Sequence, residues 1–189
     1  LAIIGVTLLF FTADLSNQNL KYGLLLYSFS LILLYAASAC YHFVKKNSIK
    51  RKLRVLDHIS IYLLIAGTYS PVVLTLLKDG NGLILFYVVW GFALVGTLLK
   101  LFFTGRYEKI SLILYVVMGS LIAIDGLAVI QNFTTLEIAM LLLGGLFYIT
   151  GIYFYVKTSI AFNHVIWHVF VMLGSLSHFL MIYFSVARL

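Results

Sequence analysis

The stretch AFNHVIWHVFVMLGSLSHFLMIYFSVA occupies residues 161–187, near the end of the chain. It contains no Asp, Glu, Lys or Arg and is longer than the roughly 20 residues that a helix needs to cross a bilayer. His164 and His168 are four residues apart within it, so on a helix they project from one face about 6 Å apart along the axis. Imidazoles at this distance can share one metal ion. The stretch therefore predicts a membrane-spanning helix that contains a pair of metal ligands.

The composition of the whole chain is that of an integral membrane protein. Of its 189 residues, 63% are hydrophobic and 10% are charged, and the mean hydropathy is +1.09, whereas soluble domains are about half apolar and about a quarter charged. A single proline and long apolar runs favour helices over the strands of a barrel. The net charge of +7 is attributed to basic loops at the membrane surface and not to nucleic-acid binding. One cysteine, Cys40, excludes an internal disulfide.

Apolar segments of spanning length recur along the chain and indicate helices. We expect membrane spans at residues 22–44, 53–77, 82–103, 110–130, 136–156 and 161–187. Residues 1–13 are apolar but shorter, and they are interpreted as the end of a first span whose start is missing. The polar breaks between the segments are too short for a second domain. The sequence therefore predicts one all-α membrane domain over residues 1–189, a bundle of seven transmembrane helices.

The distribution of positive charge predicts how the bundle is oriented. Ten of the thirteen Lys and Arg residues, Lys100 among them, are assigned to the loops after the second, fourth and sixth spans. Three, including Arg188, are assigned to the other side. Because an excess of positive charge stays in the cytoplasm, the amino terminus is predicted to be cytoplasmic and the carboxyl terminus outside.

Proline and small residues are expected to shape the helices. Pro71 should bend the third span, because it removes a backbone donor and crowds the preceding turn. Small residues in mid-helix should let neighbouring helices approach one another. They are Gly91, Gly96, Gly119, Ser120, Gly144 and Gly145.

Several polar residues share one predicted depth in the membrane. His42 lies one turn before the basic loop after the second span, Asp57 lies one turn after that loop, and His164 and His168 open the last span from the same surface. Three neutral imidazoles and a water would give a tetrahedral Zn²⁺ site with an open position, as in catalytic zinc sites. Asp57 could then act as a general base for attack on an amide or ester carbonyl. Asp57 could also accept a hydrogen bond from the bound water or from a ligand imidazole, and Ser38, one turn before His42, could do the same.

Each of these residues also has an interpretation without a metal. His42 could be an interfacial residue beside lipid headgroups. Asp57 could be a first-turn acid that the helix dipole favours and that pairs with Arg54. His164 could be solvated and His168 packed. Against these interpretations stands the common depth of four such residues from three separate segments.

Three other polar residues in the spans are expected to have different roles. His178 lies about 15 Å deeper than His168 on a helix, too far to bind the same ion, and is interpreted as a buried hydrogen-bonding partner. Asp125 should have a polar partner on another helix, with a proton pathway to His178 as the alternative. His58 points about 100° away from Asp57 on a helix and is expected at an interface.

These residues and their order resemble the hemolysin III family of bacterial membrane proteins, within the wider progestin and adipoQ receptor superfamily. The resemblance covers nearly the whole chain. Its most specific motifs are Ser38-Ala39-Cys40-Tyr41-His42, Leu56-Asp57-His58, Ala66-Gly67-Thr68-Tyr69-Ser70-Pro71, and the series His164, His168 and His178. The chain lacks the amino-terminal stretch similar to Glu-Asn-His that bacterial members usually have.

The resemblance implies a zinc ion enclosed by seven helices near the cytoplasmic face. Carried over to this chain, it implies His42, His164 and His168 as ligands, Asp57 nearby through water, and Ser38 as an auxiliary. The receptor branch is associated with hydrolysis of ceramide, a lipid amide. The bacterial branch takes its name from haemolytic, pore-forming activity, and some members have been linked to membrane-lipid homeostasis.

Two functional hypotheses follow. The first is a zinc-dependent hydrolase, ceramidase-like, that acts on a lipid amide or ester entering sideways from the bacterial plasma membrane. The second is a pore-forming or membrane-sensing protein in which zinc holds the bundle together. A retinal-binding pump is excluded because the last span has no lysine for a Schiff base. Imidazole ligands also suit other transition metals.

Overall fold

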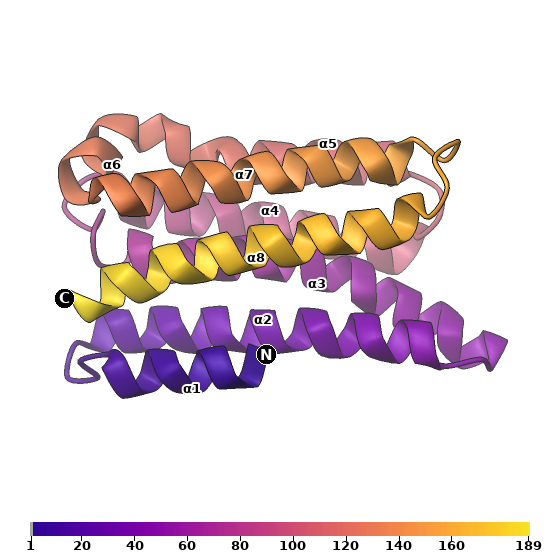
Figure 1. The fold of residues 1–189 in the computed structure, drawn as a ribbon, viewed down its shortest axis with the longest axis horizontal. Coiled ribbons are helices and arrows are strands. Elements are labelled where there is room, and N and C mark those ends of the chain that lie inside the picture. Colours follow the sequence, from indigo (N-terminus) through magenta and orange to yellow (C-terminus); the bar gives the residue numbers. More distant parts are fainter. Residues whose placement is uncertain (1) are drawn as a thin grey trace. The chain divides into compact units, whose positions relative to one another are not determined.

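The computed structural model describes residues 2–189, and these residues are helical, with turns between the helices and no strand among them. Figure 1 shows the elements in chain order. They are α1 (Ala2–Thr12), α2 (Gln18–Phe43), α3 (Asn47–Val73), α4 (Gly82–Phe103), α5 (Glu108–Ser120), the 3-10 helix η1 (Leu121–Asp125), α6 (Gly126–Asn132), α7 (Thr135–Val156) and α8 (Asn163–Ala187).

Five helical runs are long and apolar enough to cross a membrane. They are α2, α4, the continuous run Glu108–Asn132, α7 and α8. These runs confirm the predicted all-α, multi-pass membrane architecture. Membrane spans at α1 and α3, which would make seven, stay predictions, as does the cytoplasmic amino terminus.

The chain forms two compact units, one up to Gly126 and one from Leu127 to Leu189. The first contains α1 to α5 with η1, and its core includes buried side chains such as Leu24, Tyr62 and Val89. The second contains α7 and α8, which run antiparallel and pack against each other (Figure 1). The prediction of one domain over the whole chain stays a prediction.

Helix α3 differs from the predicted third span at both ends. It begins at Asn47 and not at residue 53, so the basic residues before Leu53 are helical and not part of a loop. Lys and Arg have high helix propensity, which favours this longer helix. At the other end α3 stops at Val73, two residues after Pro71. A Cβ added to Gly23 would lie 2.5 Å from the Cα of Pro71, so α2 crosses α3 in very close contact there.

The predicted fifth span, residues 110–130, is not a uniform α-helix. The α-helical pattern stops at Ser120 and is replaced by η1. The Tyr69 hydroxyl, from α3, lies at this break: it is 2.8 Å from the Met118 carbonyl oxygen and accepts a hydrogen bond from the Ile122 N–H at 2.9 Å. Tyr69 thereby satisfies backbone groups that the change of helix type leaves without intrahelical partners.

Asp125 and the small residues have partly the roles expected of them. The Asp125 carboxylate accepts hydrogen bonds from the backbone N–H and the side chain of Asn81, at the start of α4, which confirms a polar partner.

Gly144 is a close-approach position, since a Cβ there would lie 2.2 Å from the His178 ring, and a Cβ at Gly96 would lie 2.3 Å from the Tyr62 ring. No close approach is seen at Gly91, Gly119 or Gly145, where a Cβ would meet nothing within 4 Å.

Candidate metal centre

His164 and His168 form a close pair in the first turns of α8. Their Nε2 atoms are 3.1 Å apart, and the rings lie 4.6 Å apart at 88° to each other. Two nitrogens that each lie about 2.0–2.1 Å from one tetrahedral zinc ion would be about 3.3 Å apart. The pair therefore fits two ligands of one zinc ion, and the predicted common face of the helix is confirmed.

The turn between α7 and α8 fixes where His164 begins the helix. Phe162 has a left-handed backbone, with φ of 58°, which costs a non-glycine residue about 1–2 kcal/mol. Next to it, the Asn163 side chain donates a hydrogen bond to the Phe154 carbonyl at 3.2 Å and so binds the start of α8 to the end of α7. The Tyr155 ring lies 6.3 Å from the His164 ring. Contacts from α7 thus hold the first histidine of the pair.

In the first unit, the structure brings Ser38, His42 and Asp57 together from α2 and α3. The Ser38 hydroxyl donates a hydrogen bond to the Asp57 carboxylate, and His42 interacts with the same carboxylate electrostatically. The Tyr41 ring meets the His42 ring edge-on at 4.8 Å. The Asp57 carbonyl oxygen accepts a hydrogen bond from the Ser60 hydroxyl at 2.6 Å. These three polar residues thus lie close together across the turn between α2 and α3, and their roles at a metal site stay predictions.

The two groups of site residues belong to different units of the chain. That His42 joins His164 and His168 around one ion therefore stays a prediction. His178 is separate from the pair on α8, since its Nε2 lies 3.2 Å from the Leu141 carbonyl oxygen on α7. Its predicted role as a buried hydrogen-bonding partner is confirmed.

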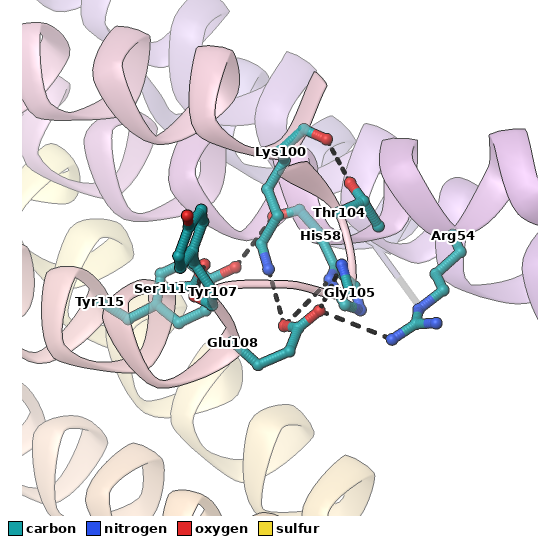
Figure 2. A network of polar contacts seen from close by, with 9 residues as sticks. All are labelled: Arg54, His58, Lys100, Thr104, Gly105, Tyr107, Glu108, Ser111 and Tyr115. Carbon is teal, nitrogen blue, oxygen red and sulfur yellow. Dashed lines mark hydrogen bonds and ion pairs between the residues drawn. The ribbon is translucent and has the colours of Figure 1, made fainter. Parts of the chain in front are cut away.

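A cluster of charged residues in the first unit was not predicted (Figure 2). Lys100, counted above as a loop charge, lies in the last turn of α4 with its side chain 1% exposed, and its Nζ is 2.7 Å from the Glu108 carboxylate. Arg54 and His58 approach the same carboxylate at 3.5 and 3.6 Å. The Tyr115 hydroxyl donates a hydrogen bond to the His58 backbone carbonyl oxygen, and the interface role expected of the His58 side chain stays a prediction. The one sequence feature that could have indicated this cluster is the position of Glu108, eight residues after Lys100.

The second unit has an ion pair that was also missed. Glu137, near the start of α7, is fully buried, and Arg188 donates to both of its carboxylate oxygens at 2.8 and 2.9 Å. Glu137 also accepts from the Thr134 N–H, while the Thr134 hydroxyl accepts from the Glu137 N–H, so the two residues form a capping box. The Thr-x-x-Glu pattern was the available signal.

The fold and these residues define a multi-pass helical membrane protein with a histidine pair on its last helix. A family profile described as Haemolysin-III related matches residues 1–179. The chain belongs to this family, and the wider progestin and adipoQ receptor superfamily is consistent with the match.

Named relatives agree with this assignment. The chain is 38% identical over 160 residues to Hemolysin-3 of Bacillus cereus, covering 85% of this chain and 73% of that protein. It is 36% identical over 179 residues to the Hemolysin-3 homolog of Bacillus subtilis, covering 95% and 84%. It is 29% identical over 185 residues to the human Monocyte to macrophage differentiation factor, covering 94% and 75%. No solved structure matches the chain.

Proposed function

We propose that His42, His164 and His168 bind one zinc ion, and that the protein hydrolyses an amide or ester bond of a membrane lipid beside it. The observation that carries the proposal is the 3.1 Å separation of the His164 and His168 Nε2 atoms, which suits two ligands of one ion. Membership of the haemolysin-III-related family supports it. The site would lie near the cytoplasmic face of a seven-helix bundle in a bacterial plasma membrane.

The chain's own residues would supply the proton transfer. His42, His164 and His168 would hold the ion, which would supply Lewis-acid polarisation of a carbonyl and activation of water. Asp57 would take up the proton as the general base, since its carboxylate has about four lone-pair sites and the bond from Ser38 uses one of them. The Ser38 hydroxyl would hold that carboxylate in one orientation.

The substrate class follows from the depth of the site. His42 and Asp57 lie within about one helical turn of the basic residues that follow α2, the level at which headgroups meet the acyl chains, and Ser38 lies one turn further along α2. The carbonyl of a lipid amide or ester lies at the same level. A ceramide-like lipid moving sideways from the bilayer would therefore meet the proposed site directly.

Metal analysis of purified protein tests the ligand set. Wild-type protein should retain about one zinc per chain, and His42→Ala, His164→Ala and His168→Ala should each lose most of it, because three imidazoles are the minimum for such a site. His178→Gln, on the same helix, is the matched control and should keep the metal, since His178 bonds to the Leu141 carbonyl. Full zinc retention in all three alanine variants would disprove the site.

Lipid hydrolysis tests the role of Asp57. Zinc-loaded protein should cleave ceramide or another lipid amide in mixed micelles, and a chelator should abolish the cleavage. Asp57→Asn should retain zinc and helical content but lose about 10²–10⁴-fold in rate, the usual contribution of a general base. Unchanged hydrolysis in Asp57→Asn would remove Asp57 from the mechanism.

The name of one relative favours a second candidate. The Bacillus cereus protein is called Hemolysin-3, which suits a pore-forming or membrane-sensing protein in which zinc holds helices together. In that case zinc removal should lower the thermal unfolding midpoint, dye release from vesicles should accompany insertion, and no lipid should be cleaved. Hydrolysis that requires both zinc and Asp57 would decide against it.

A further inference from the structure

Positive charge is concentrated at one end of the first unit, where α2 ends, α3 begins, α4 ends and α5 begins. Residues 45–57 and 100–109 contain nine Lys and Arg residues and only two acids, Asp57 and Glu108. The other three acids of this unit, Asp14, Asp79 and Asp125, lie in or beside turns at the opposite ends of its helices. This end therefore has a large excess of positive charge, and we call residues 45–54 and 100–109 the basic end.

The first turns of α3 combine that charge with exposed apolar side chains. Because α3 begins at Asn47, Ile49, Leu53 and Leu56 recur at helical spacing and share one face. Ile49 and Leu56 are 45% and 38% exposed, Lys52 is exposed beside this face, and Arg51 is exposed on the opposite side of the helix. An apolar face next to Lys and Arg is typical of a helix segment that lies at the headgroup boundary of a membrane.

Glu108 does not neutralise the basic end. Its carboxylate already has a close partner in Lys100, at 2.7 Å, and the Gly105 N–H donates to its other oxygen at 3.1 Å. Arg54 approaches the same carboxylate at 3.5 Å, and its side chain is 43% exposed (Figure 2). One carboxylate thus faces two full cations. Arg54 retains positive charge that an anion from outside can pair with.

We propose that the basic end is a binding surface for the phosphate headgroups of acidic phospholipids, with Arg51, Lys52 and Arg54 as its main contacts. An acidic phospholipid fits because its phosphate oxygens match the guanidinium and ammonium donors. Its acyl chains match the exposed face of Ile49 and Leu56. A soluble anion such as inorganic phosphate offers only the first of these contacts. The surface is independent of the proposed zinc site, and no residue of that site contributes to it.

Lipid selectivity of the full-length chain tests this surface. The protein is reconstituted in vesicles of equal parts phosphatidylcholine and phosphatidylglycerol, and the association of spin-labelled phosphatidylglycerol is compared with that of spin-labelled phosphatidylcholine. Wild-type protein should favour the acidic lipid. The triple variant Arg51→Gln, Lys52→Gln, Arg54→Gln should lose most of this preference, by about twofold to fivefold for each charge removed. Circular dichroism checks that its helical content is unchanged.

Matched variants and salts separate the surface from net charge and from a free-anion site. Lys21→Gln with Lys78→Gln removes charge at the opposite ends of α2 and α3 and should leave the preference intact. Inorganic phosphate should displace the acidic lipid no better than chloride at equal ionic strength. Equal preference in wild type and triple variant would overturn the proposal. So would an equal loss per charge removed in the control variant, which would indicate net charge alone, or selective displacement by phosphate.

Discussion

Each unit of the chain has a salt bridge with one fully buried partner, and the two differ in which partner it is. In the first unit the cation is buried, since Lys100 is 1% exposed and Glu108 is 30% exposed. In the second the anion is buried, since Glu137 is 0% exposed and Arg188 is 36% exposed. Taking either charge out of water is costly unless partners satisfy it. The two sites differ in how completely the partners satisfy the buried charge.

The Glu137 site is closed, whereas the Lys100 site is open. Arg188 binds both oxygens of Glu137 and also donates to the Asn132 carbonyl, and Thr134 donates to Glu137 as well. These bonds occupy both carboxylate oxygens of Glu137, so few hydrogen-bonding positions remain for an external ligand. They also join the end of α8 to the start of α7. Glu108, by contrast, has more cations around it than it can neutralise. The difference indicates that the Glu137–Arg188 pair is mainly structural and that the Lys100–Glu108 pair also contributes to a charged surface.

The largest expected effect comes from breaking the closed pair. Arg188→Met leaves the Glu137 carboxylate buried without its cation, so the free energy of unfolding should fall by about 3–5 kcal/mol. Thermal and denaturant unfolding in detergent micelles, followed by circular dichroism, would measure it. The double variant Arg188→Met, Glu137→Gln should recover part of the loss, because it removes the uncompensated charge. A loss below about 1 kcal/mol in the single variant, typical of exposed pairs, would contradict a closed site.

A smaller loss is expected when the open pair is broken. Glu108→Gln leaves Lys100 with a neutral partner, but water can reach the partly exposed residue 108 and the flexible lysine chain can extend toward it. The free energy of unfolding should fall by about 1–3 kcal/mol, the cost of an unsatisfied polar group. Lys109→Gln, at the neighbouring exposed position, is the control and should change it by less than about 0.5 kcal/mol. If Glu108→Gln lowered the free energy of unfolding as much as Arg188→Met does, the two sites would not differ in the way described.

The sequence predicted the helices well because long apolar runs identify them without tertiary information. It failed where distant contacts decide the local structure. The break after Ser120 depends on the Tyr69 hydroxyl from another helix, and no local pattern encodes that contact. The start of α3 was placed too late because Lys and Arg were assigned to a loop, although the same residues favour helix.

The site was predictable to the extent that spacing and chain direction define it. Four-residue spacing placed His164 and His168 together, and antiparallel helices around a short turn placed Ser38 and His42 near Asp57. Both ion pairs were missed because pairing across helices depends on how each helix is rotated about its axis. Hydropathy does not give that rotation for Lys100, which is buried although its position at the end of α4 suggested a loop charge.

Among the ion-pair variants, Arg54→Gln should have the smallest effect on stability, and it is also the sharpest test of the open site. The Arg54 guanidinium lies 3.5 Å from the Glu108 carboxylate, and the Arg54 side chain is 43% exposed. Loss of this ion pair should therefore change the free energy of unfolding by less than about 1 kcal/mol. The same substitution should weaken the preference for phosphatidylglycerol about twofold to fivefold. A structural arginine would show the opposite pattern, with stability lost and lipid preference kept. Measuring both quantities on one preparation therefore distinguishes a cation that stabilises the fold from one that faces the membrane.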